Sequence, residues 1–381
     1  MTIFAALFLT LAFGFSTQVM AESPFVENLS QTDALRLNQI QVIGSHDSFK
    51  AAIDPHLYQL MVAANPDTQE LDYAHPPLTD QLNLGLRALE LDVYHDPEGG
   101  RYAKPLGLSM VRASGNEPRP YDPDGKMLEP GFKVLHFHDV DFRSNCLTLT
   151  DALKEIRRWS DSHPRHLPVI ITLNVTDRPL NMPGTVEPLR IDRAALDALD
   201  KELLSTLGAE NLVLPDDVRG DYVTLEAAIR VSAWPTLARA RGRFLLVLDV
   251  AGRKRDDYLA GHRGLLGRAM FVDSEPGRPE AAVMIRNDPL SEGEAIAQLV
   301  RQGYLVRTRA DAGTREARKG DYSRFEAAKK SGAQVISTDY YLADWRLKPD
   351  YRIRFDQESC HRVNPLTGPM TDKKHQDVQL E

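Results

Sequence analysis

The sequence lacks several features that mark common classes of protein. Only two of its 381 residues are cysteine, and they lie too far apart for a zinc motif, which is built on close pairs of ligands. There is no long run of lysine and arginine, and 46 basic against 54 acidic residues give a formal net charge of −8. We therefore do not expect a nucleic-acid partner, which would require neutralisation of phosphates. No internal repeat is present.

Long apolar runs are also absent, except at the N-terminus. Residues Ile3–Phe15 are almost continuously apolar, and a small-residue stretch ends near Ala21. This pattern predicts a signal peptide over residues 1–21, although no lysine or arginine precedes the apolar run. We expect a secreted or periplasmic protein; an uncleaved anchor is the alternative. Export would permit a disulfide between Cys146 and Cys360, and two unpaired thiols are the other possibility.

Apolar, β-branched segments that end in polar residues alternate with helical patterns along the chain. Strands are predicted at Gln39–Ser45, Ala88–Tyr94, Lys133–Phe137, Pro168–Val175, Arg243–Val250, Ala282–Arg286, Tyr304–Thr308 and Gln334–Thr338. Helices are predicted at Leu78–Leu86, Leu149–Ser160, Ala194–Leu207, Asp257–Leu266, Ser291–Gln302 and Thr314–Ser331. Such alternation indicates an α/β fold with a parallel sheet covered by helices.

Eight strand and helix units fit a TIM-type (β/α)8 barrel. We expect it to span residues 22–347 as one domain, followed by an irregular tail over residues 348–381. A doubly wound sheet is the alternative, because strand order is not visible in a sequence. In barrels of this type the chemistry gathers at the C-terminal ends of the strands. The polar residues at the predicted strand ends are His46, Asp47, Glu90, Asp92, His136, His138, Asn174, Asp249, Arg307 to Asp311, and Asp339.

Glu90 and Asp92 are separated by one residue in a predicted strand, so their side chains project from the same face. Two converging carboxylates repel each other unless a cation or a shared proton lies between them. Oxygen ligands of this kind suit Ca²⁺ or Mg²⁺. The alternative is a pair of salt bridges to a neighbouring basic residue, such as Arg87 or Lys133.

Imidazoles follow two of the predicted strands. His46 and His136 are candidates for proton transfer and charge stabilisation, and His138 shares a face with His136 if the strand continues. With a hard cation nearby, two imidazoles suggest phosphoryl chemistry. The alternative for His46 and Asp47 is a purely structural turn.

These residues resemble a known family. The stretch GSHDSF, Gly44–Phe49, is similar to the opening motif of phosphoinositide-specific phospholipase C, and Glu90-Leu91-Asp92 and His136 resemble its next motifs. The stretches HPPLTDQLNLGLRALELDVYHDP, GFKVLHFHDVDFRSNC, LVRTRADA and SGAQVISTDYYLAD look like its secreted, calcium-dependent bacterial branch. The resemblance runs in order from about Leu37 to Asp344.

The resemblance implies a phosphodiesterase in which the 2-hydroxyl of the substrate attacks phosphorus and expels diacylglycerol. It assigns His46 to the attacking hydroxyl and His136 to the charge on phosphorus. It assigns one Ca²⁺ to the positions of Asp47, Glu90, Asp92 and Asn174. The chain departs from the family at two of these, because Asp47 replaces an Asn and Asn174 replaces a Glu. The carboxylate count is unchanged, which favours retained cation binding, with a drifted site as the alternative.

Residues at the last strand ends are candidates for contact with the substrate, because the planar guanidinium of Arg suits phosphate oxygens. This set, with the second imidazole of the third strand, is Arg307, Arg309, Asp311, Asp339 and His138. Buried Arg–Asp pairs between strands are the alternative. Leu57, Tyr58, Leu60 and Met61 are candidates for transient contact with a membrane surface, or they pack a loop. We expect a monomer.

Two other functions compete with this one. A glycerophosphodiester phosphodiesterase has a similar barrel and begins with His-Arg-Gly on its first strand. This chain has His262-Arg263-Gly264, but far from its first strand. A non-catalytic barrel that binds a phospholipid or a sugar phosphate is the second alternative, and only the changes at Asp47 and Asn174 favour it.

Overall fold

The computed structural model describes residues 32–347, 350–369 and 380–381. The predicted signal peptide and most of the segment after Thr371 lie outside the described residues. Within them, no helix combines the length and the apolar character needed to cross a membrane. Cys146 and Cys360 are two separate buried thiols.

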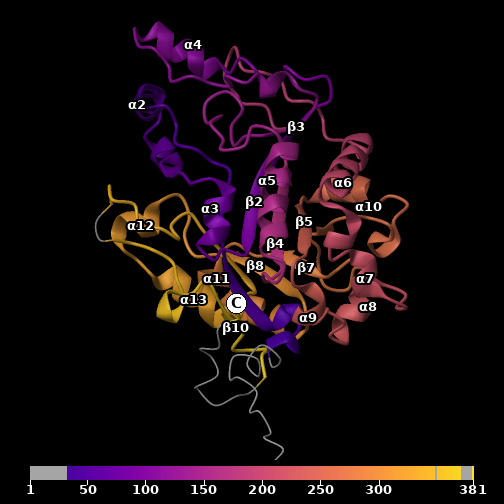
Figure 1. The fold of residues 1–381 in the computed structure, drawn as a ribbon. Helices are drawn as coiled ribbons and strands as arrows, with labels where there is room; N and C mark the ends of the chain where they lie inside the picture. Colours follow the sequence, from indigo (N-terminus) through magenta and orange to yellow (C-terminus); the bar gives the residue numbers. More distant parts are fainter. Residues whose placement is uncertain (1–31, 348–349, 370–379) are drawn as a thin grey trace, which may run out of the picture.

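The described chain forms the predicted (β/α)8 barrel (Figure 1). Its parallel strands follow the order β6-β5-β4-β2-β1-β9-β8-β7, and one bridge between Asp273 and Val283 brings β6 next to β7. The strands are β1 Ile40–Ser45, β2 Ala88–Asp96, β4 Val169–Val175, β5 Phe244–Asp249, β6 Phe271–Val272, β7 Val283–Ile285, β8 Leu305–Arg309 and β9 Val335–Thr338. Nearly every residue of these strands is buried, because the barrel interior lies on one side and helices cover the other.

Two further strands are antiparallel. β3, Gly131–Val134, pairs antiparallel with the outer half of β2, and β10, His361–Val363, pairs with the start of β1. The prediction of Lys133–Phe137 as the third barrel strand was therefore wrong, because β3 pairs with the part of β2 that continues beyond the barrel. The strand missed in its place is β6, which has only two residues and leaves no periodic signal. β10 lies in the tail that was predicted to be irregular.

The helices surround the barrel and also cover its upper end (Figure 1). α5, Leu149–Ser162, shows why the sequence pattern worked: Leu153, Ile156 and Trp159 are buried at helical spacing, and the Thr148 side chain caps the first turn. The predicted helix Thr314–Ser331 is two helices, because Gly320 ends the first in a left-handed conformation. The others are α2 Pro55–Ala64, α3 Leu78–Asn83, α4 Leu106–Ala113, α6 Arg193–Leu207, α7 Pro215–Arg219, α8 Leu225–Arg230, α9 Leu237–Ala240, α10 Gly252–Leu259, α11 Pro289–Arg301, α12 Arg315–Lys319 and α13 Ser323–Ser331.

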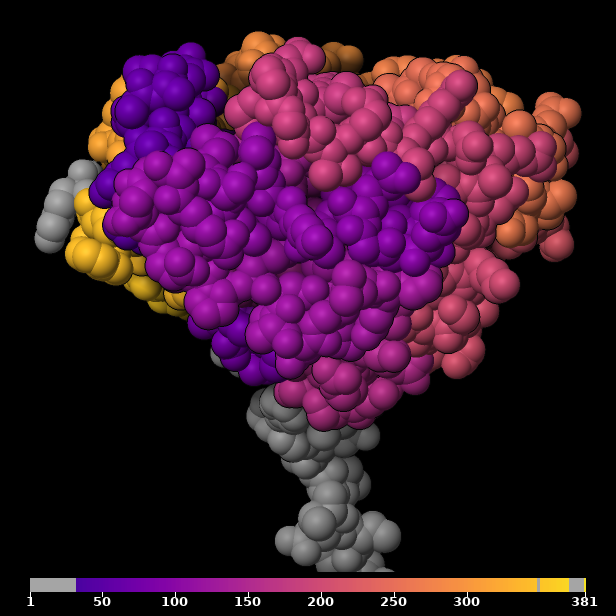
Figure 2. Space-filling view, turned by 90° about the horizontal axis from the view of Figure 1, so that it is seen from above, coloured from indigo at the N-terminus to yellow at the C-terminus, as the bar shows by residue number. Residues whose placement is uncertain are grey.

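Parts of the segments between β1 and β2, and between β2 and β4, form a layer above the C-terminal ends of the strands, where α2 and α4 lie, whereas α3 and α5 lie beside the strands (Figure 1). Viewed from above, the segments coloured purple to magenta cover the centre of this face (Figure 2). The layer has its own apolar cluster, in which Leu57 and Met61 of α2 pack against Tyr94 and Phe142. Three of the four residues proposed to contact a membrane thus pack in this layer, because Tyr58 is partly buried against the same cluster.

Candidate active site

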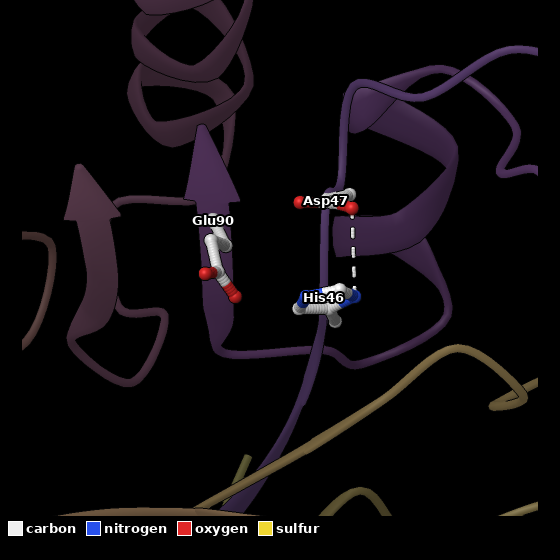
Figure 3. Close-up of side chains that lie close together, drawn as sticks. All are labelled: His46, Asp47 and Glu90. Carbon is white, nitrogen blue, oxygen red and sulfur yellow. Dashed lines mark ion pairs between the residues drawn. The ribbon is translucent and has the colours of Figure 1, made fainter. Parts of the chain in front are cut away.

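His46 and Asp47 directly follow β1, and Glu90 lies on the neighbouring strand β2 (Figure 3). A side chain at Gly44 would place a Cβ 2.5 Å from that of Ala88, so only glycine allows the two strands to lie this close. Asp47 has a φ of 45°, in the left-handed region that Asp and Asn tolerate better than most residues. The backbone therefore requires a short polar residue at the position that also offers a carboxylate.

The Asp47 carboxylate is the centre of the site. Its Oδ2 accepts a hydrogen bond from the hydroxyl of Tyr73 and lies 3.6 Å from His46 Nδ1 and 3.5 Å from His136 Nε2. Burial raises the pKa of Asp47, but the two imidazoles, Tyr73 and Arg309 together outweigh burial and lower it. Asp47 is therefore held as a carboxylate between two imidazoles.

His46 is fixed by residues of the last two strands. Its Nδ1 lies 2.9 Å from Asp339 Oδ1, and Arg309 donates to His46 Nε2 and to Asp339 Oδ2, both over 3.0 Å. Burial and Arg309 lower the pKa of His46, but the charges of Asp47, Asp339 and Glu90 outweigh them and raise it. Asp339, predicted to contact the substrate, holds the imidazole of His46.

Asp311 contacts the site residues only indirectly, through the end of β9. It is buried, accepts hydrogen bonds from the Thr338 hydroxyl and, over 2.9 Å, from the backbone N–H of Asp339. Burial, with the nearby charge of Asp339, raises its pKa to about 7. Asp311 therefore secures the end of β9, from which Asp339 reaches His46.

His136 comes from the loop after β3 rather than from a barrel strand. Its Nδ1 lies 2.7 Å from Asp141 Oδ2, so this imidazole, like His46, has a carboxylate behind it. His138 does not join it. The His138 side chain is fully buried, with Nε2 2.9 Å from the carbonyl of Val186, and burial lowers its pKa. The prediction that His136 and His138 share one face of a strand was wrong, because residues 136–138 do not form a strand.

Glu90 pairs with Arg307, which also donates to Asn287 Oδ1 over 3.0 Å and to Ser337 Oγ over 3.2 Å. Neither basic residue suggested as a partner from the sequence pairs with Glu90. Arg87 pairs with Glu381, and Lys133 lies 3.8 Å from Asp96. A salt bridge to Glu90 is thus present, but its partner is a residue that was expected to contact the substrate.

Asp92 is buried, and its Oδ1 has no hydrogen-bond partner among the described residues. Burial raises its pKa well above the ordinary value, and the charges of Asp47 and Glu90 add to this effect. Asp92, Asn174 and Asp249 lie in register on β2, β4 and β5, so their side chains share the inner face of the sheet. Burial raises the pKa of Asp249 to about 6.

These side chains fit a hard divalent cation. Ligand atoms of His46, Asp47 and Glu90 lie within 4.8 Å of one another, as do those of Asp47, Asp92 and His136. Carboxylate oxygens predominate, which suits Ca²⁺ better than a thiolate-seeking metal. A cation here would also satisfy the buried oxygen of Asp92 and relieve the repulsion among the carboxylates.

Several residues of the site carry no sequence signal. Tyr73 lies in a loop between α2 and α3, and Lys50 and Asp141 lie in irregular segments. Asp249, in contrast, was recognisable in the sequence as a polar residue at the end of a predicted strand. A buried lysine followed by a tyrosine 23 residues later has no recognisable spacing, and tertiary contacts alone bring such residues to the site.

Comparison with known proteins identifies the family. The family profile described as phosphoinositide phospholipase C, Ca²⁺-dependent, matches residues 35–365. No curated protein matches significantly. A calcium-dependent phosphoinositol-specific phospholipase C from a Pseudomonas species, a Gram-negative bacterium, has a similar structure, with a TM-score of 0.53 and 14% identity over 90% of this chain and 100% of that one. A Ca²⁺-dependent phosphatidylinositol-specific phospholipase C from Streptomyces antibioticus gives a TM-score of 0.51 and 17% identity over 81% of this chain and 96% of that one.

The structural likeness confirms the barrel, and the family profile, which spans most of the chain, confirms the resemblance found in the motifs. The chain belongs to the family of Ca²⁺-dependent phosphoinositide phospholipases C and is a phosphoric diester hydrolase.

Proposed function

We propose that this enzyme cleaves phosphatidylinositol or a closely related inositol phospholipid, with the inositol 2-hydroxyl as the nucleophile. The hydroxyl oxygen attacks phosphorus, the bond from phosphorus to the diacylglycerol oxygen breaks, and a cyclic inositol phosphate and diacylglycerol leave. The observation that carries this proposal is the pair of imidazoles on either side of Asp47, each held at Nδ1 by its own carboxylate.

His46 takes the proton of the attacking hydroxyl. With Nδ1 held by Asp339, its Nε2 is the nitrogen available for this proton, and in the free enzyme that nitrogen accepts a hydrogen bond from Arg309. His136, on the other side of Asp47, offsets in its protonated form the charge that builds at phosphorus, and its Nε2–H gives a proton to the leaving diacylglycerol oxygen. Arg309, which donates to both His46 and Asp339, is the arginine that we propose meets a phosphate oxygen.

One Ca²⁺ would be held by Asp47, Glu90 and Asp92, with the amide oxygen of Asn174 beside them. When bound, it supplies positive charge against the phosphate oxygens. The residues themselves fit this role, because three carboxylates and one amide are oxygen donors. In the free enzyme, Arg307 provides the positive charge next to Glu90.

The alternative of a glycerophosphodiester phosphodiesterase loses its motif in the structure. His262 precedes a short 3₁₀ helix, and its Nδ1 lies 2.7 Å from the carbonyl of Leu266. It is not at the end of a barrel strand.

The products separate the possible reactions. Incubation of the enzyme with phosphatidylinositol and Ca²⁺ should release a cyclic inositol phosphate, which has a phosphorus NMR signal distinct from that of an acyclic monoester. This result is expected because only a neighbouring hydroxyl on the substrate closes the ring. If glycerol phosphate accumulates instead, or if no phosphodiester with a neighbouring hydroxyl is cleaved, the proposed reaction is wrong.

We further propose that the enzyme is exported and acts as a monomer in transient contact with a membrane surface. The support for export is the sequence pattern before Ala21. N-terminal sequencing of protein collected from the periplasm or the medium should give a chain that starts close to Glu22, because signal peptidases cut after small residues. A mature chain that begins at Met1 contradicts export by this route.

A further inference from the structure

Lys50 is fully buried, four residues after His46. Burial of an amine is costly unless hydrogen bonds and an opposite charge compensate it. Lys50 Nζ donates to the backbone carbonyls of Leu71 and Tyr73, both over 2.9 Å, and lies 3.3 Å from Asp141 Oδ2. These three partners belong to two loops that both reach the active site.

Asp141 joins Lys50 to His136. Its side chain is fully buried, and the same Oδ2 that faces Lys50 lies 2.7 Å from His136 Nδ1. A carboxylate accepts hydrogen bonds only, so His136 carries a proton on Nδ1. In the neutral ring the lone pair is then on Nε2, the nitrogen that points toward Asp47, and the protonated ring carries on this nitrogen the proton that it gives to the leaving oxygen. The Asp141 contact thus selects which nitrogen of His136 faces the reaction.

The other imidazole has the same arrangement. Arg309 contacts Asp339, and Asp339 contacts His46 Nδ1. In both cases a cation holds a carboxylate and the carboxylate holds an imidazole at Nδ1, although Arg309 is 14% exposed and Lys50 is fully buried. Asp47 Oδ2 lies 3.6 Å from Nδ1 of His46 and 3.5 Å from Nε2 of His136. The two chains of contacts come from different parts of the sequence and meet at one carboxylate.

The backbone reinforces the Lys50 chain. Lys50 and Ser144 form an isolated antiparallel bridge, so the segment after β1 is paired with the loop that carries Asp141. Lys50 donates to the carbonyls of Leu71 and Tyr73, and the hydroxyl of Tyr73 in turn donates to Asp47. Lys50 therefore connects the loop that orients His136 with the loop that orients Asp47.

We propose that Asp141 and Lys50 are positioning residues of the reaction. Asp141 fixes the ring and the tautomer of His136, and Lys50 fixes Asp141 and ties it to the segment of Tyr73. The part of this inference that concerns turnover rests on the proposed function; the part that concerns the tautomer of His136 does not.

The chain offers a matched control. Lys133 and Asp96 are a second buried Lys–Asp pair, with side chains 0% and 2% exposed and a separation of 3.8 Å. They lie on the antiparallel pair of β2 and β3, and no imidazole contacts their carboxylate among the described residues. Loss of this pair removes the same kind of buried contact without touching His136.

The test uses Asp141→Asn, Lys50→Met and the control Asp96→Asn in the full-length mature enzyme. The tautomer of His136 is read from the ¹⁵N shifts of histidine-labelled protein near pH 9, where an ordinary imidazole is neutral, with the signal assigned by its loss in His136→Ala. The wild type and the control should show the Nδ1–H tautomer. Asp141→Asn should shift His136 toward Nε2–H, because the amide can donate to Nδ1.

Turnover of phosphatidylinositol is measured on the same samples. Asp141→Asn should lower kcat at least about 100-fold with KM and Ca²⁺ affinity nearly unchanged, as expected when an imidazole has the wrong tautomer. Lys50→Met should lower kcat about 10–100-fold, since it acts through Asp141. Asp96→Asn should change kcat less than about threefold, although all three variants can lower the melting temperature.

A purely structural role predicts that Asp141→Asn and Asp96→Asn lose thermal stability alike and keep the His136 tautomer and kcat. That result overturns the proposal. If the wild type has no activity on any inositol phospholipid, the proposed function fails, and the ¹⁵N tautomer measurement alone decides the assignment of Asp141. If Asp141→Asn does not fold, Lys50→Met with the same two measurements decides it.

Discussion

Replacement of either imidazole, in His46→Ala or His136→Ala, should lower kcat on phosphatidylinositol by about two to four powers of ten, the range for loss of an acid–base or charge-stabilising group. Both variants should still bind Ca²⁺, because the proposed ligands are carboxylates and an amide. The reason lies in the geometry: each ring has a nitrogen within 3.6 Å of Asp47, and each is held at Nδ1 by a second carboxylate.

A third histidine serves as the control. His361 on β10 has a side chain 12% exposed, close to the 18% of His46 and 14% of His136, but it pairs with the opposite end of β1. His361→Ala should leave kcat within a few-fold of the wild type. Rates are followed with folding checked by thermal melt and Ca²⁺ binding by calorimetry. Wild-type turnover by folded His46→Ala and His136→Ala would show that the imidazoles are not catalytic.

The barrel was predictable because its strands are buried on both faces and so read as continuous apolar runs, as in the segments that became β4 and β5. The same signal misled at Lys133–Phe137, since an apolar antiparallel strand outside the barrel looks like a barrel strand. It was too weak at β6, which contributes two residues. The number of barrel strands was thus predictable. One predicted strand, Lys133–Phe137, lies outside the barrel, and β6 was missed.

The site was predictable where strand geometry alone sets it. Glu90 and Asp92 on one strand, and His46 and Asp47 after another, follow from register. Residues held by loops were not predictable. His138 was placed by assuming that a strand continued, and Tyr73, Lys50 and Asp141 reach the site through contacts that no periodic pattern encodes.

The two arginines predicted to contact the substrate also contact other residues of the site. In the free enzyme, Arg307 contacts Glu90 and Arg309 contacts His46. Each guanidinium therefore contacts a group with a proposed role in the reaction. Arg307 contacts the proposed cation ligand Glu90, and Arg309 contacts the proposed base His46.

The cation site gives the last prediction. Glu90→Gln should weaken Ca²⁺ binding at least about 10-fold, because affinity follows the charge and number of oxygen ligands. Arg307→Gln should leave the Ca²⁺ affinity unchanged or raise it, because this substitution removes the positive charge that pairs with Glu90. Titration calorimetry measures both. The increase in melting temperature with added Ca²⁺ is a second readout that needs no substrate.

Glu280→Gln is the matched control for Glu90→Gln. Glu280 is 4% exposed against 5% for Glu90, and it also pairs with an arginine, Arg278, at 2.6 Å. Both substitutions remove one negative charge from the protein and leave an arginine without its partner. A long-range effect of net charge would therefore weaken Ca²⁺ binding equally in both variants. If Glu90→Gln binds Ca²⁺ as the wild type does, Glu90 is a structural partner of Arg307 and the cation is held elsewhere.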